Sequence, residues 1–259
     1  KEFKDTETKN TLDLLKDDVH TQYLPLAIDT ILQKTNFQGQ RYTILEQTGS
    51  KVVFTTRVED GISLIKTISL PPDKYNINMD IALKNDTNDE VSALYSIVAS
   101  SMITREGEPS ADMAAVTGLA LGSKRTKLLR TAPKEFPSRN ESVGIIWAGS
   151  TNKYFSTILK PSSSDLIASM NAQGMLTNEK AEQGDFMVTV QTNKFRIPPH
   201  ETVNHSYIYF AGPKKEQILE QYETLDTLLS YGWFASISKV LLTFLNAVYR
   251  VIPNYGISI

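Results

Sequence analysis

The chain has 259 residues, 41% of them hydrophobic and 22% charged, which is the composition of a folded globular protein rather than a disordered one. Its 27 basic and 29 acidic residues give a formal net charge of −2. This balance excludes the basic surface that binding to DNA or RNA requires. Cysteine is absent, so disulfides, thiolate metal ligands and a cysteine nucleophile are excluded too.

Length and hydropathy favour one large domain with appendages. No stretch approaches the roughly 18 consecutive apolar residues of a membrane-spanning helix. Residues 1–10 are too polar for a secretion signal. If the chain works outside the cytoplasm, we therefore expect it to be part of a longer protein.

The first 36 residues mix charged and apolar side chains without a sustained period, although Leu12, Leu15 and Val19 indicate a short helix. From residue 40 the pattern changes to runs rich in Val, Ile, Thr, Tyr and Phe, separated by turn residues at intervals near ten. This pattern is typical of a β-sandwich. The predicted strands before Gly107 cover 41–47, 52–58, 62–70, 75–83 and 91–103.

The strand over 75–83 has the clearest alternation. Tyr75, Ile77, Met79, Ile81 and Leu83 alternate with polar or small residues, which predicts one buried and one wet face. Residues 107–140 resemble a long loop. Further strands are expected over 143–147, 154–159, 186–191 and 207–211.

After Ala211 the apolar period changes from two residues to 3.6. Gly212-Pro213 can begin a helix, and Ile218, Tyr222, Leu225 and Leu229 form one apolar stripe along it. Gly232 marks the end of this helix. A second helix is predicted over 233–252, where Pro253 stops it.

The second predicted helix is strongly amphipathic, and its charges, Lys239 and Arg250, are both basic. Such a helix suits the headgroup region of a bilayer with anionic lipid, but its periodicity fits core packing against the sandwich equally well. The apolar side of the helix comprises Trp233, Phe234, Ile237, Val240, Leu241, Phe244, Leu245, Val248, Val251 and Ile252.

Residue patterns of catalysis are absent from the sequence. His20, His200 and His205 have no metal-binding spacing, and His200 and His205 would lie on opposite faces of a strand, so we interpret the histidines as surface loop residues. There is no nucleophile elbow, P-loop or dinucleotide fingerprint. We therefore predict no catalytic, cofactor-binding or metal-binding residues, no cofactor and no enzymatic activity.

A basic run lies between Gly122 and Pro137. It could contact acidic lipid or an acidic partner surface, or it could simply be a solvated loop. Its members are Lys124, Arg125, Lys127, Arg130 and Lys134.

The C-terminal part carries three segments in a recognisable order: 211–214 (AGPK), 231–238 (YGWFASIS) and 254–259 (NYGISI). Upstream lie 66–70 (KTISL), the strand over 75–83, and Trp147 followed by 153–155 (KYF). Together these segments resemble YidC-type (YidC/Oxa1/Alb3) membrane protein insertases, and the likeness spans 60–259.

The resemblance implies the large periplasmic domain of such an insertase in the bacterial inner membrane. Its fold would be mainly β, a twisted β-supersandwich of galactose-mutarotase-like shape followed by C-terminal α-helices. The implied organisation is an N-terminal segment over 1–36, the supersandwich over 37–212, a linking amphipathic helix over 213–231, an interfacial amphipathic helix over 232–253, and the start of the second transmembrane helix over 254–259.

The resemblance also implies function and partners. The parent protein would insert and help fold nascent inner-membrane proteins, alone or with the Sec translocon subunits SecYEG and SecDF. This domain would be a scaffold and docking surface at the bilayer. Two alternatives stay open: a mutarotase-like enzyme, and an extracytoplasmic peptide- or carbohydrate-binding module. A groove of such a module could be lined by Phe186, Phe195, Tyr207 and Tyr209, although these residues fit the core equally well.

Overall fold

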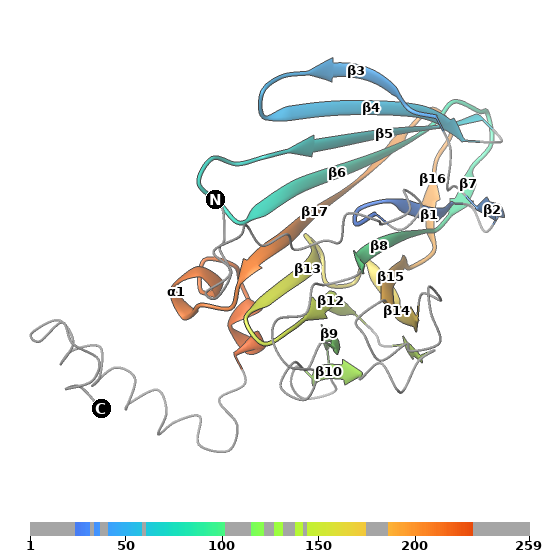
Figure 1. Ribbon diagram of the computed structural model, residues 1–259. Helices are drawn as coiled ribbons and strands as arrows, with labels where there is room; N and C mark the ends of the chain where they lie inside the picture. The colour runs from blue at the N-terminus through green and yellow to red at the C-terminus, as the bar shows by residue number, and fades with distance from the viewer. Residues whose placement is uncertain are drawn as a thin grey trace, which may run out of the picture. The chain divides into compact units, whose positions relative to one another are not determined.

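The structure is a computed structural model (Figure 1). It describes residues 24–31, 34–36, 41–58, 61–101, 115–121, 127–131, 138–141, 144–174 and 186–229. The chain divides into two units, Lys1–Pro213 and Lys214–Ile259, which are taken separately below.

The larger sheet of the first unit has nine antiparallel strands in the order β10-β9-β12-β13-β17-β6-β5-β4-β3. Its long central strand β17 pairs with β13 on one side and β6 on the other (Figure 1). The strands are β3 (Thr43–Gln47), β4 (Lys51–Val58), β5 (Ile62–Ser69), β6 (Asn76–Asn85), β9 (Ala115–Ala120), β10 (Lys127–Thr131), β12 (Ile145–Thr151), β13 (Phe155–Pro161) and β17 (Thr202–Pro213).

The second sheet has six strands in the order β11-β14-β15-β8-β1-β2, and β16 and β7 form a separate pair. The strands of the six-stranded sheet are β1 (Ile28–Ile31), β2 (Lys34–Asn36), β8 (Tyr95–Ser101), β11 (Ser138–Glu141), β14 (Ile167–Gly174) and β15 (Phe186–Thr192). The pair is β7 (Val91–Ala93) and β16 (Phe195–Ile197).

Alternation along the strands places the core between the two sheets. On β6, Met79, Ile81 and Leu83 are almost completely buried while Asp80 is exposed, which confirms the predicted buried and wet faces. One hydrophobic cluster joins these side chains to residues of the six-stranded sheet such as Ile97 and Val188. Burying each such side chain contributes about 1.5–3 kcal/mol. The predicted mainly-β, sandwich-like fold is confirmed.

The prediction of a long loop over 107–140 is wrong, because this region contains the strands β9, β10 and β11. The β9 sequence, AVTGLA, consists mostly of small and apolar residues with one threonine, and all six residues are buried, so it shows no alternation of wet and dry positions. Gly118 lets this strand approach the six-stranded sheet closely, since a Cβ there would lie 3.0 Å from Sδ of Met170. Small residues such as Gly and Ala allow close packing but have low β-propensity, so a strand made of them is not recognisable from the sequence pattern.

The N-terminal segment also contributes to the sheets. Strand β1 pairs with β8 and with β2, although residues 28–36 show no clear strand period. The short helix expected around Leu12, Leu15 and Val19 lies outside the described residues.

In the second unit, the described part of the expected helix over 213–231 holds two short elements, α1 (Glu216–Leu219) and a 3₁₀ helix (Leu225–Leu228). The buried residues Leu219, Tyr222, Leu225 and Leu228 recur every third position, which matches a 3₁₀ period rather than 3.6. Thr224 adopts a left-handed conformation (φ 70°), which interrupts a continuous α-helix. No helix in the described parts of the chain is long and apolar enough to cross a bilayer.

Candidate docking surface and inner-face cluster

Most of the predicted contact residues fall outside the part of the chain that the structure describes. This holds for the whole apolar side of the helix over 233–252, for Lys239 and Arg250, and for Lys124 and Arg125. Lys127 is exposed as the first residue of β10, and Arg130 lies further along the same strand. Their role in lipid or partner contact stays a prediction.

A polar cluster that the sequence patterns did not indicate lies on the inner face of the nine-stranded sheet. Register pairing aligns Lys66 on β5 with Ile81 on β6, and Ile81 with His205 on β17. Because paired residues point to the same face, Lys66 and His205 both face the interior beside the buried Ile81.

His205 is tied to the opposite sheet by the phenol of Tyr95, which also contacts Tyr207 on β17. The hydroxyl of Tyr95, on β8, lies 2.7 Å from Nδ1 of His205 and 2.7 Å from the hydroxyl of Tyr207. The ring of Phe195 meets the imidazole edge-on at 4.8 Å between centroids. The cluster therefore joins the two sheets. His200, in contrast, is an exposed turn residue, so the surface interpretation holds for it and is wrong for half-buried His205.

The protonation states of this cluster follow from burial. Desolvation lowers the pKa of His205 and raises the pKa values of Tyr95 and Tyr207, so the imidazole is neutral and both phenols keep their protons near neutral pH. The simplest consistent chain has Tyr207 donating to Tyr95 and Tyr95 donating to Nδ1 of His205, which places the imidazole proton on Nε2. Two phenols and a neutral imidazole, without a carboxylate, make a structural tie rather than an acid–base pair.

Lys66 makes a second tie between the sheets. Its ammonium donates a 2.6 Å hydrogen bond to the carbonyl of Leu26, in the turn that leads into β1. Leu26 itself has a left-handed backbone (φ 68°). Burial lowers the pKa of Lys66 to about 8. The charge of the ammonium strengthens this hydrogen bond, but burying the charge away from water costs free energy.

The most accessible apolar strand is β3, which has β4 as its neighbour in the nine-stranded sheet. All five of its residues are exposed, with Ile44 at 53% and Leu45 at 59%. The ladder to β4 is irregular between Ile44 and Glu46, which indicates a bulge at Leu45. An exposed edge strand with apolar side chains can accept an additional strand from another polypeptide.

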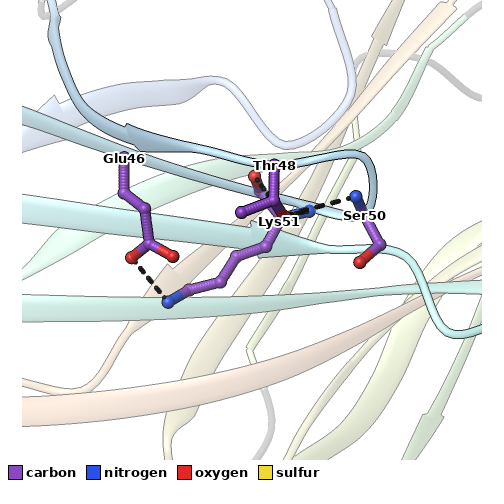
Figure 2. Close-up of polar contacts among 4 residues, drawn as sticks. All are labelled: Glu46, Thr48, Ser50 and Lys51. Carbon is purple, nitrogen blue, oxygen red and sulfur yellow. Dashed lines mark hydrogen bonds and ion pairs between the residues drawn. The ribbon is translucent and has the colours of Figure 1, made fainter.

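The β3–β4 turn is well ordered by its own polar groups (Figure 2). The backbone N–H of Lys51 donates to Oγ1 of Thr48 at 3.1 Å, and the ammonium of Lys51 lies 2.8 Å from a carboxylate oxygen of Glu46. Both charged side chains are about half exposed, so this ion pair contributes at most about 0.5 kcal/mol. It also neutralises the one charge that β3 carries.

The aromatic residues proposed to line a binding groove are mostly core. Phe186, Tyr207 and Tyr209 are at least 95% buried, and Phe195 packs partly buried against the same cluster. Within the described residues, no group of three or more His, Asp or Glu could hold a metal ion. The described residues thus form a β-sandwich domain with an exposed edge strand and a polar cluster in its interior.

The family of the chain follows from comparison with known sequences. The model of the YidC periplasmic domain matches residues 3–244, so the chain belongs to this family. The match confirms the resemblance found in the sequence and extends it to the N-terminal segment.

Relatives agree with this assignment. The chain is 23% identical over 269 residues to the membrane protein insertase YidC of Francisella philomiragia, covering 97% of the chain and 46% of that relative. It is 22% identical over 270 residues to the YidC of Francisella tularensis, with the same coverage. The chain thus spans about half the length of these relatives.

Solved structures with a similar backbone include sugar enzymes. A galactose mutarotase-like protein from Lactobacillus casei has a TM-score of 0.49 at 9% identity, covering 68% of this chain and 75% of that one. A galactose mutarotase related enzyme from Lactobacillus acidophilus has a TM-score of 0.44 at 7% identity, covering 68% and 72%. A likeness this distant is no indication of catalysis.

Proposed function

We propose that the chain is the periplasmic domain of an inner-membrane insertase, whose whole protein inserts nascent membrane proteins and helps them fold. The observation that carries this proposal is the family match over residues 3–244. The relatives that the chain matches over 97% of its length are named insertases. Because the chain spans about half of them, the insertion activity belongs to the whole protein rather than to this part alone.

Within that protein, this domain is a scaffold and docking surface and is not an enzyme. The docking surface is the β3 edge, where Ile44 and Leu45 are exposed and the single charge is paired within the hairpin. Its partners are extended segments of other polypeptides, either nascent inner-membrane proteins or the Sec translocon subunits SecYEG and SecDF. Backbone pairing at a strand edge supplies affinity with little demand on side-chain sequence, which suits diverse clients.

The segment over 233–252 lies on the bilayer surface, with Trp233 and Leu241 on its apolar side and Lys239 and Arg250 towards anionic headgroups. It holds the sandwich at the periplasmic side of the membrane. Charging the apolar side, as in Leu241→Asp, removes this attachment.

Co-sedimentation with anionic liposomes tests the membrane part of this proposal. The intact chain should bind, and a chain truncated after Ser230 should not, provided that circular dichroism shows both to be folded. The variant Leu241→Asp should resemble the truncated chain, and Thr243→Asp, on the polar side of the same segment, should bind more like the intact chain. Equal binding by the intact and truncated forms would refute the surface-lying segment.

The β3 edge is tested in the whole protein. Ile44→Lys with Leu45→Lys should reduce site-specific crosslinking from β3 to nascent membrane proteins or translocon subunits. Thr67→Lys, on the outer face of β5 away from this edge, is the control. Crosslinks that are unchanged by the double substitution would place docking elsewhere. A mutarotase activity measured on purified chain would instead support the enzyme alternative.

A further inference from the structure

Strand directions in the nine-stranded sheet gather particular turns at one end. Register pairs Asn76, at the start of β6, with Phe210, and pairs Phe155, at the start of β13, with Pro213. The turn between β5 and β6 and the turn between β12 and β13 therefore lie at the end where β17 stops. They flank β17 on its two sides, because the strand order is β12-β13-β17-β6-β5 (Figure 1).

We call these two turns, residues 70–75 and 152–154, the exit rim, because the chain leaves the first unit between them at Pro213. Two exposed large hydrophobic residues lie on it, Leu70 at 51% and Tyr154 at 50%. Lys74 and Lys153 are exposed beside them, and the ammonium of Lys153 lies 4.8 Å from the ring centroid of Tyr154. Each turn thus presents one apolar side chain together with a lysine, and the first turn also carries the exposed Asp73 beside Lys74.

The exit rim has a defined shape. In the β12–β13 turn, Oδ1 of Asn152 accepts hydrogen bonds from the backbone N–H groups of Tyr154 (2.9 Å) and Phe155 (2.7 Å). In the other turn, the carbonyl of Tyr75 accepts a 2.8 Å bond from the N–H of Ala211, beside the end of β17. Both apolar side chains are thus held outward by turns fixed to the sheet, although leaving them exposed to water costs free energy.

The opposite end of the same strands has a different character. The turn after β6 carries Asp86, Asp89 and Glu90, and the turn before β17 carries Glu201. Lys84 and Arg196 pair with Asp86 and Glu90. The two ends of the sheet therefore differ in chemistry, with lysines and exposed apolar residues at the end that leads to the second unit.

We propose that the exit rim is a second membrane-contact site, in which Leu70 and Tyr154 enter the headgroup region of the bilayer and Lys74 and Lys153 meet anionic lipid. This inference rests on the proposed function, which places the segment over 233–252 on the membrane. An aromatic and an aliphatic side chain with nearby lysines match the chemistry of the lipid–water interface. The chain leaves the first unit at this same end, at Pro213.

The spacing of the two turns suits this role. Their nearest strands, β13 and β6, are separated only by β17, so they lie two strand spacings or roughly 10 Å apart. Sheet twist rotates these strands by only about 40–50° relative to each other, so both turns can meet one flat surface. Leu70 follows β5, one strand further out, and the register places it about five residues along the strands from Tyr154, so the two anchors are roughly 20 Å apart. Two anchors at this distance restrict the tilt of the sandwich more than one would.

The absence of cysteine permits a direct test with single environment-sensitive labels on the intact chain. Leu70→Cys and Tyr154→Cys, each carrying the fluorophore NBD, should shift to shorter wavelength and gain intensity on vesicles of phosphatidylcholine and phosphatidylglycerol. Thr202→Cys is the matched control, because Thr202 is exposed at the opposite end of β17, 11 residues or roughly 36 Å from Pro213. Its label should stay unchanged.

Binding strength gives a second measurement. Leu70→Ser with Tyr154→Ser should lower the partition coefficient about 10-fold, because two partly buried side chains lose their transfer free energy. Replacing Lys74 and Lys153 by Gln should lower it about 5–30-fold on anionic vesicles and little on phosphatidylcholine alone. Leu24→Ser, which shortens an exposed apolar side chain outside the exit rim, should leave it unchanged.

The outcomes separate this inference from the proposed function. Loss of binding on truncation after Ser230, with silent labels at 70 and 154, would overturn the exit rim and leave the surface-lying segment intact. A label on Leu128→Cys, an exposed residue of β10, tests the alternative site. If its fluorescence alone changes, the exit rim is overturned and the basic region around β10 contacts the membrane instead. Absence of binding by every form would overturn both proposals.

Discussion

Lys66 makes the sharpest prediction at the scale of single residues. Its pKa is lowered from 10.5 to about 8 by burial, so the folded state resists protonation at this site. Below pH 8 Lys66 is protonated in both the folded and the unfolded state, so the folded state carries the full cost of burying the charge. This cost to the stability of the fold decreases as the pH rises from 8 to 10.5. Lys66→Met removes the penalty. The difference in free energy of unfolding between this variant and the wild type should shrink by up to about 3 kcal/mol across that range, as measured by urea denaturation.

The matched control is Lys74→Met, which removes an exposed lysine from the β5–β6 turn. This variant keeps Lys66, so the increase in stability with pH that Lys66 causes should persist in it. A pH-independent effect of Lys66→Met would show that the lysine is hydrated in the folded protein and that its carbonyl partner, Leu26, is not in a dry site.

The Tyr95 hydroxyl is the second residue-scale prediction. Tyr95→Phe should lower the free energy of unfolding by about 2–3 kcal/mol, because it leaves a hydroxyl on Tyr207 and Nδ1 of His205 without their partner in the core. Tyr207→Phe should cost only about 1 kcal/mol, since Tyr95 keeps its bond to His205. Equal losses in the two variants would contradict the order of donors proposed for this chain.

At the scale of elements, the contact between β12 and β13 depends on one glycine. A Cβ on Gly149 would lie 2.0 Å from the carbonyl oxygen of Thr157 and 2.9 Å from Cα of Ile158 on the paired strand. Gly149→Ala should therefore force the strands apart and cost more than about 3 kcal/mol. Gly49→Ala, in the β3–β4 turn with nothing within 4 Å, should change stability little, and thermal denaturation compares the two.

The same elements show what could be predicted from the sequence and what could not. Strands such as β5 and β6 were recognisable because β-branched and apolar residues alternate with polar ones. Strand β9 was not, since its small residues are buried throughout and lack alternation. The single helix expected after Pro213 was replaced by shorter elements because Leu219 and Tyr222 follow a three-residue spacing.

The inner-face cluster was hidden for a different reason. Tyr95 and His205 are 110 positions apart, and their hydrogen bond depends on how two sheets face each other. No local period reports such a contact. The family, in contrast, was recognisable from short C-terminal segments, because a sequence motif is carried by the chain itself and needs no knowledge of packing.

At the scale of the whole first unit, both sheets share one hydrophobic cluster, so they should unfold together. In the variant Trp233→Phe, fluorescence reports Trp147 alone, which is fully buried on β12. Its urea transition should coincide with the loss of β-structure seen by circular dichroism. A separate, earlier transition of either probe would show that the sheets form independent folding units.

Strand β17 also determines how the domain bears tension. It holds seven residue pairs with β13 and nine with β6 and ends at the point where the chain leaves the first unit. Because ladder hydrogen bonds run perpendicular to the strands, a pull on Pro213 along β17 loads them in shear, and many must break at once rather than one after another. If the C-terminal segment is attached to the membrane, lateral drag from a client or a moving translocon would be transmitted to the sandwich as a rigid body, and the connecting segment would stretch before the domain unravels.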